Sequence, residues 1–97
     1  MANTFKFRIP ISQRQGLPAW LFPMGEKLHL DGTLTLNEAG NIQNLAIADV
    51  AYRVTGEAGV PDIDNNLFLY SPSNRKNRIN IPVREFFRII GFNPGNG

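Results

Sequence analysis

Two stretches of the chain alternate between apolar and polar residues, which is the period of a strand buried on one face. In residues 4–9 every second residue is apolar, and Pro10 limits further extension. In residues 28–36 leucines occupy even positions and polar residues odd ones, with Gly32 in the middle of the apolar face. We expect Gly32 to mark a bend, a bulge or the close approach of a neighbouring aromatic ring.

A turn that contains glycine, residues 37–41, follows the second alternating stretch, and a new apolar run begins at Ile42. This arrangement predicts a β-hairpin. The return strand, residues 42–54, carries apolar residues on both faces, and a bulge near Ala48 would reconcile them.

Prolines and glycines interrupt residues 10–26, and between them lies an apolar cluster that includes Trp20. We interpret this segment as a loop that packs against the core rather than as a solvated linker. A small domain needs its large apolar side chains for the core, so we expect Trp20 to pack inward. An exposed contact for a partner is the alternative.

The second half of the chain begins with a predicted loop at residues 55–66, where glycine, proline and asparagine accumulate. Residues 67–70 predict a short apolar strand. A polar, basic loop at residues 71–77 then leads to another short strand at 78–80.

Residues 81–90 change to the helical period, with an apolar stripe at i, i+3, i+4 and i+7 that starts from Val83. Asn80 is expected to cap the N-terminus of this helix, and Gly91 suits the left-handed position that ends it. The last residues, 93–97, are expected to fray.

These elements predict a single α+β domain over residues 1–97. We expect an antiparallel sheet of about four to five strands with one short C-terminal helix packed against it. A chain of 97 residues allows one small core and hardly two domains. Its apolar share of 42% suits a folded globular protein, whereas seven prolines and nine glycines argue against a helical bundle.

The chain contains no cysteine, which excludes disulfides, a thiolate nucleophile and zinc held by cysteine. His29 is the single histidine, so a second imidazole could come only from a symmetric oligomer. The N-terminus lacks the basic and apolar regions of a signal peptide, and no run is long enough to span a membrane. We therefore expect a cytoplasmic protein with no membrane partner.

No familiar catalytic motif is present. Ser71 and Ser73 flank Pro72 outside the context of a nucleophile elbow, and the glycine patterns of phosphate-binding loops are missing. Asp62 and Asp64 resemble the start of a calcium loop, but the later glycine and glutamate are absent, so an ordinary acidic turn is the better interpretation. We expect no catalytic residues, no metal site, no cofactor and no enzymatic activity.

Positive charge concentrates in residues 75–88, where Glu85 is the single acidic residue beside five basic ones. The basic residues are Arg75, Lys76, Arg78, Arg84 and Arg88. Arg84 and Arg88 lie four residues apart on the polar side of the expected helix, where like charges repel, so this spacing suits an anion better than it suits the helix. A solvated polar face is the alternative interpretation.

The polar loop before the helix carries side chains that donate hydrogen bonds to phosphate. Arg75, Lys76 and Arg78 are placed to neutralise two or three phosphates. Asn74 and the arginines can reach base edges, and Tyr70, if exposed, offers a stacking face to an unpaired base.

The stretch from Asn66 to Lys76, followed by Ile81 and Pro82, resembles the SpoVG family of small bacterial nucleic-acid-binding regulators. In that family a comparable apolar strand runs into a Pro-Ser and basic loop, then a strand that ends in proline, then a helix. The resemblance implies an antiparallel sheet with a helix against it, a dimer formed through strand edges, and DNA or RNA binding through the basic loop and helix.

The resemblance covers about residues 30–85, and within it Arg75 and Lys76 match basic positions of the family. The chain departs from the family pattern in an added N-terminal segment through Met24 and in a longer loop at residues 55–65. It also has Tyr70-Ser71 before Pro72, where the family usually has a bulkier apolar residue. Arg78, Arg84 and Arg88 are proposed from charge placement alone.

Two functions of different classes follow from these patterns. The first is a small non-enzymatic nucleic-acid-binding protein whose C-terminal basic loop and helix contact phosphates of DNA or RNA. The second is a protein-interaction or assembly subunit that self-associates through a sheet edge or the Trp20 loop. A homodimer is compatible with both.

Overall fold

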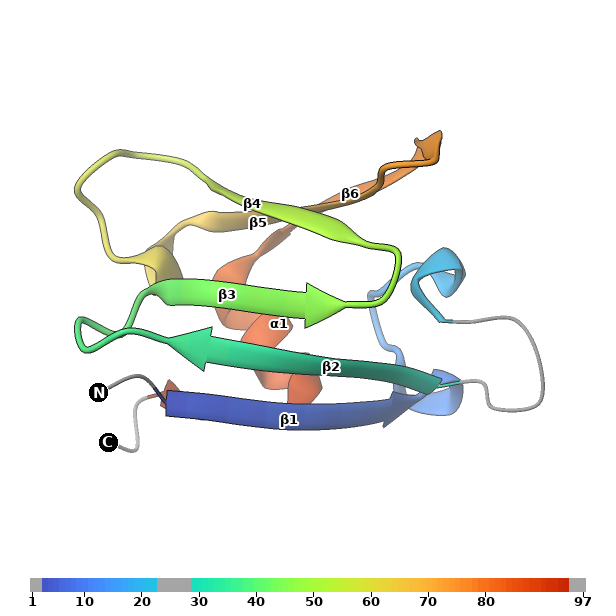
Figure 1. The fold of residues 1–97 in the computed structure, drawn as a ribbon, viewed down its shortest axis with the longest axis horizontal. Coiled ribbons are helices and arrows are strands. Elements are labelled where there is room, and N and C mark those ends of the chain that lie inside the picture. The colour runs from blue at the N-terminus through green and yellow to red at the C-terminus, as the bar shows by residue number, and fades with distance from the viewer. Residues whose placement is uncertain (1–2, 23–28, 95–97) are drawn as a thin grey trace.

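The structure is a computed structural model that describes residues 3–22 and 29–94, and it shows two antiparallel sheets and one helix (Figure 1). The strands of the first sheet are, in spatial order, β1 (Asn3–Pro10), β2 (His29–Leu36) and β3 (Ile42–Ile47). Those of the second sheet are β4 (Ala51–Thr55), β5 (Asn66–Ser71) and β6 (Asn74–Pro82). The α+β class is confirmed, but six strands in two sheets replace the expected single sheet of four or five.

The first sheet confirms the two alternating stretches and the hairpin predicted from the sequence. In the turn between β2 and β3, the backbone N–H of Asn41 donates to Oδ1 of Asn37 at 3.0 Å. Gly32 on β2 lies directly across from Phe7 on β1, and the Phe7 ring fills the space that a side chain at Gly32 would need. Of the three interpretations of Gly32, the structure therefore supports the close approach of an aromatic ring.

The chain turns sharply between β3 and β4, where the sequence predicted one long strand with a bulge near Ala48. The N–H of Val50 donates to the carbonyl oxygen of Ile47 at 3.1 Å, and Asp49 has a left-handed backbone with φ of 61°. Aspartate is one of the few residues besides glycine that adopt this conformation readily. The turn carries the chain from the first sheet to the second, so the prediction of one bulged strand is wrong.

The hairpin of β5 and β6 contains most of the predicted basic loop. Its turn is confined to Pro72 and Ser73, and residues 74–77 already belong to β6. The register shifts between Tyr70 and Ser71, next to this turn, as expected where extra residues bulge out of a ladder. The basic segment is therefore held on a strand, which corrects the prediction of a loop over residues 71–77 and a strand of only three residues after it.

The helix α1 (Val83–Ile90) buries the apolar stripe predicted for it and contacts strands of both sheets. Asn80 does not cap this helix, because the helix begins after Pro82 and no side chain bonds to its N-terminus. The N–H of Val83 donates instead to the carbonyl oxygen of Asn65 at 3.0 Å. Gly91 ends the helix in a left-handed conformation with φ of 83°, as predicted.

One hydrophobic cluster joins the two sheets, α1 and the N-terminal loop. The loop contains two short 3-10 turns, η1 (Ile11–Gln13) and η2 (Ala19–Leu21), and buries Leu17 and Phe22. Trp20 is half-buried and packs against the cluster, as expected. Positions 23–28 of the predicted loop and strand, and 95–97 of the predicted tail, lie outside the described residues.

Asp62 connects the loop before β5 to the hairpin of the first sheet. It begins η3 (Asp62–Asp64), and its Oδ2 accepts a hydrogen bond from the N–H of Ile42 at 2.8 Å. The N–H of Asp62 in turn donates to Oδ1 of Asn41 at 3.0 Å. The acidic turn at Asp62 thus links the loop before β5 to the β2–β3 hairpin, which is about twenty residues earlier in the chain.

Replacing Asp62 with alanine is expected to lower the free energy of unfolding by about 1 to 2 kcal/mol, because the N–H of Ile42 loses a charged acceptor in a partly buried position. A urea titration followed by circular dichroism measures this change as a lower midpoint at constant slope. Glu57→Ala is the matched control, since the exposed Glu57 takes part in the hydrogen bonds with Asn65 only through its backbone N–H and carbonyl groups. Equal midpoints for the two variants would contradict the bracing role.

Candidate nucleic-acid interface

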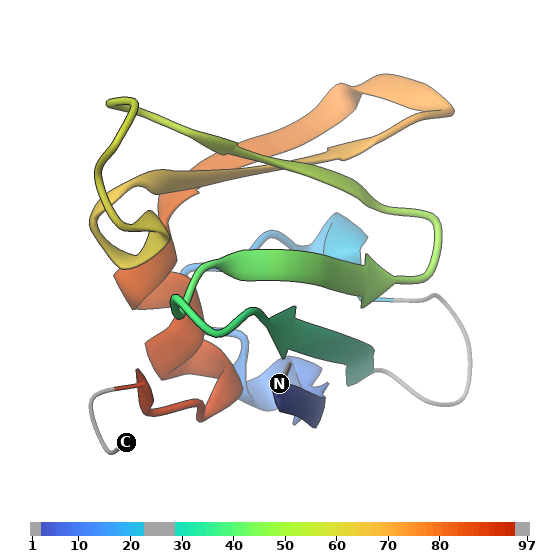
Figure 2. The same ribbon diagram turned by 60° about the vertical axis from the view of Figure 1, so that its left-hand side comes forward.

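The second sheet buries one face and leaves the other without a covering segment of the described chain, above β4 to β6 in both views (Figures 1 and 2). Residues paired across strands share a face of a sheet. The inner face carries Leu67 and Leu69, both with no exposed surface. The opposite face, here called the outer face, carries two rows of residues across the strands. The rows are Arg53, Phe68 and Asn80, and Ala51, Tyr70 and Arg78.

Phe68 and Tyr70 form a stacked aromatic pair on the outer face. Their ring centroids lie 5.3 Å apart with 28° between the ring planes. The guanidinium carbon of Arg53 lies 5.3 Å from the centroid of Phe68, which is within range of a cation–π interaction. Both aromatic residues are half-buried, and neither belongs to the hydrophobic cluster or packs against it. Tyr70 therefore lies on the uncovered side of the sheet rather than in the core.

The three strands of the second sheet hold four basic residues and no acidic residue. All four are exposed, namely Arg53, Arg75, Lys76 and Arg78. None of them makes an ion pair with a carboxylate of the described residues. Unpaired charges of one sign on neighbouring strands add to one positive potential, which attracts anions.

The turn of the β5–β6 hairpin presents part of this charge at the far end of the sheet, where the hairpin projects from the rest of the molecule (Figure 2). Arg75 and Lys76 follow the turn and are exposed. Oδ1 of Asn74 accepts a hydrogen bond from the N–H of Lys76 at 3.1 Å. The side-chain oxygen of Asn74, predicted to reach a base edge, thus holds the backbone that carries the two cations.

The two helix arginines lie apart from the outer face. Arg84 donates to Oδ1 of Asp64 at 2.7 Å, and Arg88 donates two hydrogen bonds to the Glu85 carboxylate. The hydrogen bonds between Arg88 and Glu85 raise the pKa of Arg88 and lower the pKa of Glu85. Buried residues of α1 share the hydrophobic cluster with Leu67 and Leu69, so the helix packs on the inner face of the second sheet and not on the face that carries Arg78. The structure brings together five of the predicted residues, Tyr70, Asn74, Arg75, Lys76 and Arg78.

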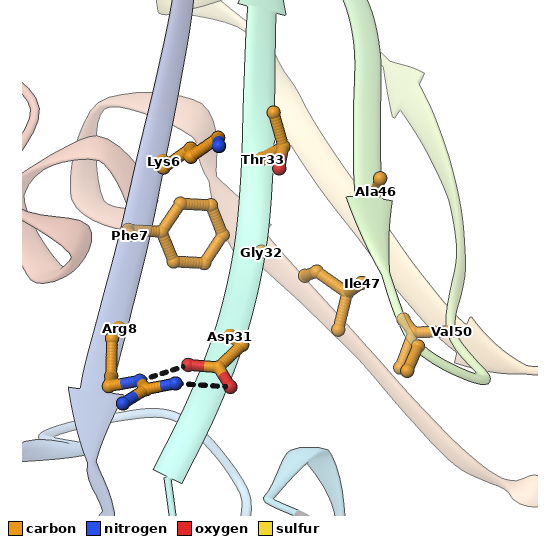
Figure 3. A pocket seen from close by; sticks show the side chains of 10 residues that line it. Lys6, Phe7, Arg8, Asp31, Gly32, Thr33, Ala46, Ile47 and Val50 are labelled. Atoms are coloured by element: carbon orange, nitrogen blue, oxygen red, sulfur yellow. Dashed lines mark hydrogen bonds and ion pairs between the residues drawn. The ribbon is translucent and has the colours of Figure 1, made fainter.

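A hollow on the outer side of the first sheet contains an arginine that is paired with an aspartate (Figure 3). It lies over Gly32 and is lined by Lys6, Arg8 and Asp31 among other residues. Arg8 donates two hydrogen bonds to the Asp31 carboxylate, at 2.7 and 3.3 Å, and the hydrogen bonding raises the pKa of Arg8. A polyanion would have to compete with Asp31 at this hollow, which makes it a weaker candidate than the outer face of the second sheet.

The acidic residues of the described chain form no group that could hold a metal ion, and Asp64 pairs with a basic side chain. Within residues 3–22 and 29–94, no three histidine, aspartate or glutamate residues are grouped to hold a metal ion. Asp64 pairs with Arg84, and Oδ1 of Asn65 accepts a hydrogen bond from the N–H of Glu57 at 3.2 Å.

In residues 3–22 and 29–94, no helix has the length and apolar character needed to cross a membrane.

The sequence interpretation missed three residues of the outer face, which are Arg53, Phe68 and Asn80. The signal for Phe68 was present, because leucine alternates with an aromatic residue over Leu67 to Tyr70. A strand buried on one face alone places such alternate residues on opposite sides. Arg53 is remote in sequence from the basic cluster, so only the pairing of β4 with β5 reveals its place.

No protein-family model, no curated protein and no solved structure matches this chain. The resemblance to the SpoVG family therefore stays a prediction that rests on the residues around Pro72.

Proposed function

We propose that the protein binds nucleic acid through phosphate contacts made by the outer face of the second sheet and its hairpin. One observation carries this proposal: four exposed basic residues pair with no carboxylate of the described chain and lie on strands that contain no acidic residue. Such a surface releases counterions from a polyanion when it binds, and this release drives nucleic-acid binding of any sequence.

The charge of the outer face is a local feature and not a consequence of an excess over the whole chain. The formal net charge of the protein is only +2. Elsewhere among the described residues, Arg8, Arg84 and Arg88 are each paired with a nearby carboxylate, whereas Lys6 on β1 and Arg14 in the N-terminal loop are unpaired but lie in different elements. The contrast supports a role for the unpaired group, since scattered acidic neighbours would otherwise weaken its field.

The first test is a salt titration of the unmodified protein against a labelled oligonucleotide, followed by fluorescence anisotropy. Four phosphate contacts predict a slope of about −3 to −4 in log affinity against log salt, and an affinity that falls roughly 50- to 250-fold between about 50 and about 200 mM salt. An oligonucleotide of the same sequence with an uncharged backbone is the control, and we expect it not to bind. Absence of binding at low salt, or binding that salt does not change, contradicts the proposal.

Self-association through a sheet edge or the Trp20 loop is the second function proposed from the sequence. Trp20 is half-buried and packs against the protein's own core, which leaves only part of its surface for a partner. Within the described residues, β1 and β3 are the edge strands of the first sheet, and β4 and β6 are those of the second. The homodimer and the cytoplasmic location stay predictions, and sedimentation at several protein concentrations tests the dimer.

A further inference from the structure

We infer that the nucleic acid bound by the outer face is single-stranded and that its unpaired bases stack on Phe68 and Tyr70. This inference rests on the proposed function, which needs only the charges. The aromatic pair is a separate observation, and it narrows the ligand from any polyanion to one that offers both phosphates and free base faces.

Phe68 and Tyr70 lie outside the hydrophobic core, so their rings do not stabilise the fold as buried aromatic rings would, and a binding role explains their position. A domain of this size depends on its large apolar side chains for its core. Phe7, Phe86 and Phe87 are buried in that core, whereas Phe68 and Tyr70 stand on the opposite side of the second sheet. Their alternation with the buried leucines of β5 fixes this orientation, because a strand sends neighbouring side chains to opposite faces.

The residues around the rings suit a nucleotide chain. Arg53 and Asn80 lie directly across from Phe68, and Arg78 lies across from Tyr70. The arginines can contact phosphates beside a stacked base, and the side-chain amide of Asn80 can donate to and accept from a base edge. The fourth neighbour, Ala51 beside Tyr70, is small and leaves room next to that ring.

A duplex does not fit this arrangement, because paired bases are stacked on one another and present only their edges in the grooves. A protein partner fits it poorly for another reason. Covering the outer face with another protein would bury Arg53 and Arg78, which pair with no carboxylate of the described residues, unless the partner supplied carboxylates to match. Buried unpaired charge is strongly unfavourable. A single strand supplies one phosphate with every base.

The test compares anisotropy titrations of three forms of the full chain against single-stranded DNA, single-stranded RNA and duplex DNA of one sequence, roughly 16 nucleotides long. The forms are the unmodified protein, the double variant Phe68→Leu/Tyr70→Leu, and the matched control Phe68→Tyr/Tyr70→Phe, which exchanges the two rings and keeps both. Thermal melting of each form verifies that it folds.

We expect the unmodified protein to bind at least one single strand at least tenfold more tightly than the duplex. The leucine variant should lose at least tenfold in single-strand affinity while its salt slope stays unchanged, and the ring-exchanged control should keep its affinity within about threefold. A folded leucine variant that binds as well as the unmodified protein overturns the stacking inference and leaves the proposed function standing. Equal affinity for single strand and duplex also overturns it. Failure to bind any nucleic acid overturns the proposed function as well.

Discussion

Replacing Arg53, Arg75, Lys76 and Arg78 together with glutamine is expected to lower nucleic-acid affinity more than a hundredfold at about 0.1 M salt. Each basic residue that contacts a phosphate contributes about 0.7 to 0.9 to the salt slope, so the slope should flatten by roughly three units. The substitutions remove charges that form no ion pair with residues 3–22 or 29–94, and they leave the hydrophobic cluster untouched. Anisotropy titrations at three or more salt concentrations measure both effects.

The matched control is the double variant Arg84→Gln/Arg88→Gln on α1. It also removes positive charge from exposed side chains, but from residues already paired with Asp64 and Glu85. We expect it to change affinity by less than about fivefold and to leave the salt slope within one unit. If the helix variant weakened binding as much as the sheet variant, the outer face would not be the interface. The same conclusion would follow if the sheet variant melted at the same temperature as the unmodified protein and bound nucleic acid with the same affinity.

The local elements of this fold could be predicted from sequence because their signals are local. Alternation defines β1 and β2, the turn at residues 37–41 defines the hairpin, and the apolar stripe with Gly91 defines α1 and its end. The division into two sheets was missed because it depends on a turn without glycine or proline. Asp49 adopts its left-handed backbone there, and the surrounding apolar residues conceal the break.

The site was predicted only in part, because some of its residues are far apart in the sequence and come together only in the folded protein. Arg75, Lys76 and Arg78 are close together in sequence and stay close on β6, whereas Arg53 joins them through strand pairing. The like-charge spacing on α1 suggested an anion, but the acceptor for Arg84 is Asp64, twenty residues away. Because these residues are far apart in sequence, sequence patterns alone reveal neither that Arg53 belongs to the site nor that Arg84 pairs with Asp64.

Replacing Gly32 with alanine is expected to lower the free energy of unfolding by about 2 to 3 kcal/mol. The added Cβ would lie 2.8 Å from Cε2 of Phe7 and nearer still to Cζ, and 3.0 Å from the carbonyl oxygen of Ala46. Phe7 is only 7% exposed and meets Phe86 edge to face, with ring centroids 6.1 Å apart, so its ring has little room to move. Overpacking of a core commonly costs this much, and for a domain of this size it lowers the melting temperature by roughly 10 to 20 °C.

Gly16→Ala is the control for this substitution, because a Cβ at Gly16 meets no atom of the described residues within 4 Å and the backbone there is not left-handed. It should leave the melting temperature within about 3 °C of the unmodified protein. Phe7→Leu shortens the side chain that meets the new Cβ. Combined with Gly32→Ala, it should therefore cost at least about 1 kcal/mol less than the sum of the two single changes. Strict additivity in this cycle would mean that the ring does not occupy the space beside Gly32, and the explanation given for this glycine would be wrong.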